Sequence, residues 1–236
     1  MTENKRDNLI RVDMHCHTQL SKDSLNDPRK LVDTAAARGL GALCVTDHNA
    51  LANALALSRL PGLPIKIIPS EEVKSSEGEI IGYYLTEVVP KGLTPEETVK
   101  RIKGQGGLVA IPHPFDSLRT ASRIETPALY RLVDAGMVDI LEVLNARSID
   151  VEDNRKAHEY AIEHNLAMSA GSDAHTLLEV GRAYAEVPPF DGPEQFLAAL
   201  RQGTIHGTVS NKLVHIGSTW ARVAKAIPVV GQKWRR

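Results

Sequence analysis

The chain has 236 residues, of which 42% are apolar and 24% are charged, and its 28 basic and 29 acidic residues give a formal net charge of −1. This profile is typical of a soluble globular enzyme domain and gives no global electrostatic case for nucleic-acid binding. The sequence has no run of eighteen apolar residues and no apolar signal segment in its polar N-terminus, so we expect a cytoplasmic protein without membrane contact.

Short apolar strands alternate along the chain with longer helical patterns. The candidate strands are Ile10–His15, Ala42–Thr46, Ile65–Pro69, Leu108–Ile111, Val138–Leu144, Ala167–Ala170 and Ala183–Val187, and an extended pair over Val73–Leu85 turns near Glu77 and Gly78. Candidate helices start near Pro28, Leu51, Pro95, Thr126, Val151 and Pro193. Repeated strand–helix units predict a parallel sheet, either open or closed into a barrel.

The end of the chain differs in charge from the rest. No acidic residue follows Glu194, whereas several basic residues do, among them Lys212, Arg222, Lys225, Lys233, Arg235 and Arg236. We therefore assign residues 9–210 to one α/β domain and residues 211–236 to a basic C-terminal tail. Because basic tails are usually just solvated, contact with nucleic acid is a possible but not a favoured interpretation.

Histidines and carboxylates gather directly after five of the predicted strands. They occur as DMHCH (13–17), TDHN (46–49), SEE (70–72), PHPFD (112–116) and SDAH (172–175). The carboxyl ends of barrel strands meet at one face, so we expect these side chains to converge. Alternation along a strand predicts that Asp13, His15 and His17 share one face, as Asp173 and His175 do. Such a cluster would repel or stay unpaired without cations, so the pattern predicts a metal site.

In this order the five motifs resemble the PHP (polymerase and histidinol phosphatase) superfamily, over residues 9–210. The stretches GEIIGYYL, QGGLVAIPHPFD, EVLNAR and AGSDAHT are most similar to small stand-alone bacterial and archaeal members, which are usually described as predicted phosphoesterases. The resemblance implies a distorted seven-stranded (β/α) TIM-like barrel, the PHP fold, with two or three divalent metal ions. A shell of imidazoles and carboxylates suits Mn, Zn or Fe better than Mg alone.

The resemblance also implies a ligand set. One ion would be surrounded by His15, His17, Glu72 and Asp173. A second ion would be surrounded by Asp23, His48 and His175. His113 would bind a third ion, with Glu72 bridging. Many relatives carry a histidine where this chain has Glu79, so two alternatives stay open: Glu79 completes the third site, or it turns to solvent and the enzyme works with two ions.

Several neighbouring residues have two interpretations. Asp47 is expected to orient an imidazole rather than to bind metal, and Glu72 fits the family pattern better than Glu71. Arg147 either clamps a phosphate bidentately or forms a surface ion pair, and Arg119 has the same two interpretations.

The predicted activity is hydrolysis of a phosphate ester of a small metabolite or nucleotide by metal-activated water. Its catalytic residues would be Asp173, His113, His175 and Arg147, with His113 or His175 protonating the leaving oxygen if metal does not fully engage it. One alternative is a non-catalytic regulatory module that binds metal, against which the intact motifs argue. Another is an amide or lactone hydrolase of the same barrel type. The sequence leaves open the substrate, the choice between mono- and diester, and the oligomeric state.

Overall fold

The computed structural model describes residues 8–209 and Lys225. The predicted barrel, residues 9–210, falls almost entirely within this part of the chain. The predicted basic tail, residues 211–236, lies outside the described residues except for Lys225. None of the helices described there has the length and apolar character that a bilayer crossing requires.

A single mixed sheet organises the described residues. Its strands are β1 (Ile10–Cys16), β2 (Ala42–His48), β3 (Lys66–Ser75), β4 (Gly78–Tyr83), β5 (Leu108–Ile111), β6 (Ile140–Asn145), β7 (Ala167–Gly171), β8 (Ala183–Val187) and β9 (Thr204–Gly207). Their order in space is β7-β6-β5-β4-β3-β2-β1-β8-β9. The runs β1 to β3 and β5 to β7 are parallel, whereas β4, β8 and β9 pair antiparallel with their neighbours.

The sheet curls into a nearly closed, barrel-like ring. Strand β7 packs against β1 and β8, and a parallel bridge joins Ala174, just after β7, to Cys16 at the end of β1. At this seam the His17 N–H donates to the Ala174 carbonyl at 3.0 Å, and the Asp173 N–H donates to the His15 carbonyl at 2.7 Å. The described residues form nine strands rather than the implied seven, because β4 returns beside β3 and because β8 and β9 extend the sheet beyond β1.

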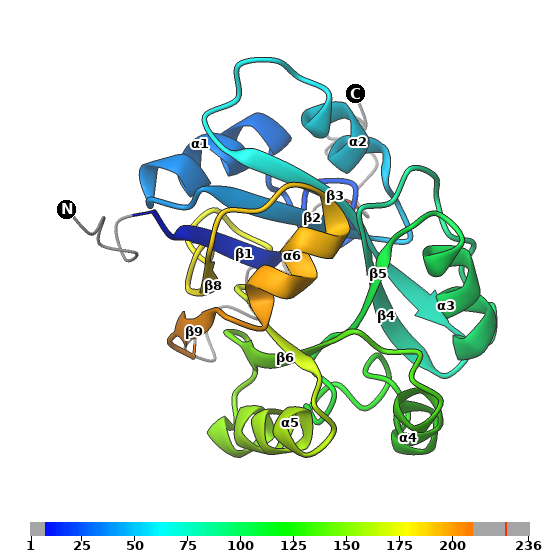
Figure 1. Ribbon diagram of the computed structural model, residues 1–236. Helices are drawn as coiled ribbons and strands as arrows, with labels where there is room; N and C mark the ends of the chain where they lie inside the picture. The colour runs from blue at the N-terminus through cyan, green and yellow to red at the C-terminus, as the bar shows by residue number, and fades with distance from the viewer. Residues whose placement is uncertain (1–7, 210–224, 226–236) are drawn as a thin grey trace.

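Helices cover the outside of the ring and one of its ends. They are α1 (Pro28–Ala37), α2 (Ala52–Ser58), α3 (Pro95–Lys103), α4 (Thr126–Asp134), α5 (Val151–Glu163) and α6 (Gly192–Leu200), and each begins within one residue of its predicted start. Local chemistry explains two starts: the Asp27 side chain accepts from backbone N–H groups of α1, and Thr94 and Glu97 form a capping box at α3. Figure 1 shows α6 across the middle of the ring, with the other helices around it.

Two apolar layers result from this arrangement. Inside the ring, Met14, Ile68 and Tyr83 are fully buried and belong to one cluster with Phe196 of α6. This cluster includes residues at the starts of several parallel strands, so α6 fills that end of the barrel. Outside, the other strand faces pack against the helices, as Val45 does. The polar motifs therefore lie at the opposite, open end.

The expectation that Asp13 shares a face with both histidines is wrong. The pairing of β1 with β2 shifts register between Asp13 and Cys16, and the extra residue resets the alternation. As a result Met14 packs inside the ring while Cys16 packs outside it. The Asp13 carboxylate instead accepts hydrogen bonds from the backbone N–H groups of Ser172 and Gly181, at 2.9 and 2.8 Å.

Candidate metal centre

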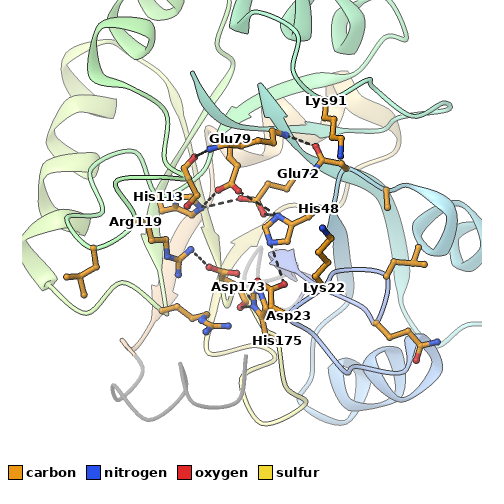
Figure 2. Close-up of a pocket in the computed structure, with 18 of the residues that line it drawn as sticks. Lys22, Asp23, His48, Glu72, Glu79, Lys91, His113, Arg119, Asp173 and His175 are labelled. Atoms are coloured by element: carbon orange, nitrogen blue, oxygen red, sulfur yellow. Dashed lines mark hydrogen bonds and ion pairs between the residues drawn. The ribbon is translucent and has the colours of Figure 1, made fainter. Parts of the chain in front are cut away.

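The predicted ligands converge at the open end of the barrel. Seven of them line a cavity of about 1330 Å³: Asp23, His48, Glu72, Glu79, His113, Asp173 and His175. The other two, His15 and His17, are fully buried and lie against this set. Figure 2 shows the labelled carboxylates and imidazoles pointing toward one another from different strands and loops. Strand ends thus bring together residues that are up to 160 positions apart, as His15 and His175 are.

The first set of potential ligand atoms comes from the two sides of the seam. His15 Nε2 and His17 Nε2 are 3.1 Å apart, and Asp173 Oδ1 lies 3.3 Å from His17 Nε2 and 3.7 Å from His15 Nε2. These three atoms are close enough to one another to hold one ion. Glu72 Oε2 lies 3.4 Å from His15 Nε2 and 3.5 Å from His17 Nε2, so it reaches the same set.

Hydrogen bonds fix which nitrogen of each imidazole faces the set. The Ser21 hydroxyl donates its hydrogen to Asp47 Oδ1 at 2.6 Å, so His17 Nδ1, 3.1 Å from Ser21 Oγ, must be the donor in that contact. His15 Nδ1 likewise donates to Glu142 Oε1 at 3.0 Å. In both residues Nε2 is therefore the nitrogen turned toward the ligand set, and Asp47 orients His17 through Ser21.

These two Nε2 atoms require a positive charge between them. Burial lowers the pKa of His15, but Asp173, Glu142 and Glu72 raise it well above its ordinary value. Burial lowers the pKa of His17 to about 4, and His175 and His48 act in the same direction. Without metal, a proton on His15 thus bridges to neutral His17. A divalent cation can take the place of that proton, so the residues present fit a metal ion.

A second set surrounds Asp23 in the loop after β1. Asp23 Oδ1 lies 3.3 Å from His175 Nε2 and 3.7 Å from His48 Nε2. His175 Nδ1 donates to the Asp173 carbonyl at 2.8 Å, which leaves its Nε2 for the cavity. Nitrogen atoms of His17, His48 and His175 are also close enough to share one ion. The structure therefore brings together Asp23, His48 and His175, the residues that the family resemblance groups, and His17 lies between both sets.

Glu72 and Glu79 define the third set. Glu72 Oε2 is 3.0 Å from His48 Nδ1, and its Oε1 is 3.2 Å from His113 Nε2. Glu79 Oε1 is 3.8 Å from His48 Nδ1, and its Oε2 is 3.7 Å from His113 Nε2. Glu79 is only 7% exposed, so the alternative in which it turns to solvent is wrong. The set that could share one ion contains His48, Glu72 and Glu79.

The charges in this cluster depend on one another. Burial alone would raise the pKa of Asp173, but Arg119 and His15 hold it well below its usual range. Burial opposes charge on His48, yet Glu72 and Glu79 raise its pKa to about 10. Burial raises the pKa of Glu79, and the negative charge of Glu72 adds to that effect. The carboxylates therefore hold protons on nearby imidazoles, which divalent ions would displace.

The neighbouring glutamates on β3 separate clearly. Glu72 points into the cluster, whereas Glu71 accepts a hydrogen bond from the Val89 N–H at 2.9 Å, outside it. No motif singled out Glu142, but its Oε2 accepts a hydrogen bond from the His113 N–H at 2.8 Å while its Oε1 accepts one from His15 Nδ1. The available signal was a carboxylate inside the apolar strand β6, a position that is costly unless it is hydrogen-bonded.

Two arginines reach the cavity wall. Arg147 is 4% exposed and its Nε lies 3.6 Å from Glu179 Oε1, so the surface ion-pair interpretation is wrong. Arg119 donates to Asp173 Oδ2 and lies 3.4 Å from Asp116 Oδ2. Arg119 thus supports the outer oxygen of a carboxylate whose other oxygen faces the imidazoles.

Comparisons with known proteins agree with this geometry. The PHP domain model matches residues 13–103, and the PHP-associated model matches residues 151–205. An uncharacterized protein of Methanocaldococcus jannaschii is 36% identical over 199 residues, which cover 81% of this chain and 79% of that protein.

Solved structures show the same fold at lower identity. A two-domain protein from Bacteroides vulgatus, described as containing a predicted PHP-like metal-dependent phosphoesterase, superposes with a TM-score of 0.71 at 19% identity, covering 90% of this chain and 70% of that one. A lesion-specific endonuclease from Pyrococcus furiosus gives a TM-score of 0.59 at 21% identity, covering 84% and 57%. From the family matches and the archaeal relative together, we conclude that the chain belongs to the PHP family.

Proposed function

We propose that this protein is a metal-dependent phosphoesterase that hydrolyses a phosphate ester of a small metabolite or nucleotide. The observation that carries the proposal is the convergence of three sets of potential ligand atoms at the floor of one cavity, with arginines in its wall. The sets share His17 and His48, so neighbouring ions would lie close together. Closely spaced ions are typical of enzymes that act on phosphate esters.

The proposed ligands are the nine residues named from the family resemblance: His15, His17, Asp23, His48, Glu72, Glu79, His113, Asp173 and His175. Their imidazole nitrogens and carboxylate oxygens favour Mn, Zn or Fe. Bound ions would supply a polarised phosphoryl group and an activated water. The chain itself would orient the ligands through Glu142 and through Ser21 with Asp47.

Arg147 and the histidines have proposed roles at the substrate. Arg147 lines the cavity, and its guanidinium can match two phosphate oxygens. His113 and His175 also line the cavity, so either can hold a proton for the leaving oxygen when it is not bound to metal. One oxygen of Asp173 faces the imidazoles and the other accepts from Arg119. This arrangement supports a role for Asp173 in positioning the metal ligands relative to the reacting phosphoryl group.

The test is a substrate panel on protein that is stripped of metal and reloaded with Mn²⁺, Zn²⁺ or Fe²⁺. p-Nitrophenyl phosphate, bis(p-nitrophenyl) phosphate and a lactone distinguish monoester, diester and carbonyl hydrolysis. We expect phosphate release that a chelator abolishes. His175→Ala should lose it, and His206→Ala, at an exposed histidine of β9 outside the cavity, should keep it.

Two results would overturn the proposal. Turnover of the lactone alone would indicate the amide or lactone hydrolase. Tight metal binding without turnover of any phosphate ester, including phosphorylated metabolites and oligonucleotides, would indicate a regulatory module.

A further inference from the structure

Positive side chains surround the proposed metal ligands. Among the described residues, six cationic side chains line the cavity: Lys22, Lys74, Lys91, Arg119, Arg147 and Lys225. Divalent ions would offset the carboxylates at the cavity floor, so these six charges would act on whatever enters the cavity. Whether each one can bind a ligand depends on the contacts that it already makes within the protein.

Two of the lysines are occupied by backbone carbonyls. The Lys225 ammonium donates to the carbonyls of Gln19, Ser21 and Ser24, in two cases at 2.7 and 2.6 Å. An ammonium has three N–H donors, so these bonds use its full capacity. The Lys74 ammonium donates to the Ala121 carbonyl at 2.7 Å and reaches the next carbonyl as well. Both lysines therefore hold loops together.

The two arginines also have carboxylate partners. Arg119 donates to Asp173, and Arg147 lies beside Glu179. Lys22 and Lys91 differ from all four. Both are exposed, and the described part of the chain offers neither ammonium a hydrogen-bond or ion-pair partner.

Lys22 and Lys91 come from separate segments but reach the same cavity. Lys22 lies in the loop after β1, and Lys91 lies between β4 and α3. Figure 2 shows both on the His48 side of the cluster, across from Arg119. The cavity, about 1330 Å³, is far larger than one phosphate group needs. This unpartnered pair of cations therefore lies across the cluster from Arg119, in a cavity with room for a further phosphate group.

We propose that Lys22 and Lys91 form a second anion subsite, which binds a phosphate group of the substrate other than the one that is cleaved. This inference rests on the proposed phosphoesterase function and names its substrate class: a compound with at least two phosphate groups. Such a phosphate can belong to a small bisphosphorylated metabolite or to the next nucleotide of a short chain. In both cases two ammonium groups without competing carboxylates meet a phosphate anion.

The test compares probes that differ by one phosphate. Fructose 6-phosphate is paired with fructose 1,6-bisphosphate, and thymidine 5′-monophosphate is paired with 5′-phosphorylated dithymidine. Each Kd is measured by calorimetry at 4 °C on the Mn²⁺-loaded full chain, and chromatography of the same samples measures hydrolysis. We expect the second phosphate to tighten binding about tenfold in at least one pair, as one or two charge-assisted contacts would do.

Matched variants assign that gain to the lysines. The double variant Lys22→Met with Lys91→Met keeps the aliphatic stems and removes both charges, so it should lose most of the tenfold ratio while the Kd of the monophosphate stays within about twofold. The double variant Lys22→Arg with Lys91→Arg keeps both positive charges, so it should keep the tenfold ratio of the two Kd values. Lys156→Met, at an exposed lysine of α5 outside the cavity, should leave it unchanged.

Each outcome bears on the proposal. A gain in affinity with the sugar pair identifies a bisphosphorylated metabolite as the source of the second phosphate group. A gain in affinity with the nucleotide pair identifies a nucleotide chain as that source. A gain that survives in the double Met variant, or no gain in either pair, overturns the subsite. Binding that follows the expected pattern without hydrolysis supports the subsite and counts against the proposed activity. Failure of every probe to bind overturns both.

Discussion

Glu142→Gln tests whether the orientation of one imidazole controls metal binding. Both oxygens of the buried Glu142 accept hydrogen bonds: Oε1 from His15 Nδ1 at 3.0 Å, and Oε2 from the His113 N–H at 2.8 Å and the Asn145 amide at 3.0 Å. A glutamine has only one acceptor oxygen. Facing it toward His113 and Asn145 satisfies two donors, so the amide NH₂ would face His15 Nδ1.

In that position His15 Nδ1 must become an acceptor, so the imidazole loses its Nδ1 proton and keeps the one on Nε2. Nε2 is the atom 3.1 Å from His17 Nε2 that a metal would bind. Restoring the binding tautomer would set Nδ1–H against an NH₂ group in a buried site, which costs about 1–3 kcal/mol. At about 1.4 kcal/mol per tenfold, metal affinity should fall by about 10- to 100-fold, the range seen when partners of metal-binding histidines are removed.

The assay is competition for Mn²⁺ or Zn²⁺ with a chelator of known affinity, with the imidazole ¹⁵N shifts of the metal-free protein reporting the tautomer of His15. Glu186→Gln is the control, because Glu186 pairs with the partly exposed Arg11 away from the cavity. An unchanged metal dissociation constant in folded Glu142→Gln would refute the reasoning, and so would weakened binding in a variant whose metal-free His15 still carries a proton on Nδ1.

Four further outcomes are expected. At pH 7 metal loading should release protons from His15 and His48, whose pKa values are raised; a pH indicator in weak buffer would detect this. A chelator should lower Tm by about 5–10 °C relative to metal at about 100 Kd, measured by calorimetry. Glu79→Ala should lower the number of metal ions bound per chain, and Glu79→His should restore part of it. An unchanged number in Glu79→Ala would show that Glu79 is not a ligand. Asp173→Asn should abolish turnover and lower Tm, because Arg119 loses its buried partner.

The barrel is predictable from sequence because its signals are local. Apolar runs of strand length end in polar motifs, and proline or capping residues start the helices, so each element can be recognised without knowing its neighbours. The convergence of most of the nine candidate ligands then follows from topology, since the ends of parallel strands meet at one face. Glu79 reaches the same face from the start of the antiparallel strand β4. Strand β9 is the exception. Its sequence, TIHG, is short and largely exposed, and it pairs only at the edge of the sheet.

Contacts between distant side chains could not be predicted in this way. Arg119 meets Asp173 across 54 positions, and Glu142 meets His15 across 127. The alternation of side chains along a strand also does not reveal an inserted residue. Because the register of β1 shifts after Asp13, Asp13 faces away from the two histidines, contrary to the prediction. The Glu79 question had the same origin: a strand residue opposite Lys74 could face either way until the curvature of the hairpin was known.

The site lies on the seam of the barrel, where β7 meets β1, and this position explains the role of the buried carboxylate of Asp13. His15 and His17 come from one side of the seam, and Asp173 from the other. Bringing buried imidazoles and carboxylates together costs free energy unless a cation is present. Asp13 joins the two sides independently of metal, because it accepts from the backbone of Ser172 and Gly181 while it belongs to β1. The seam is thereby held closed in the metal-free protein, and ligands from both sides are already near one another when an ion arrives.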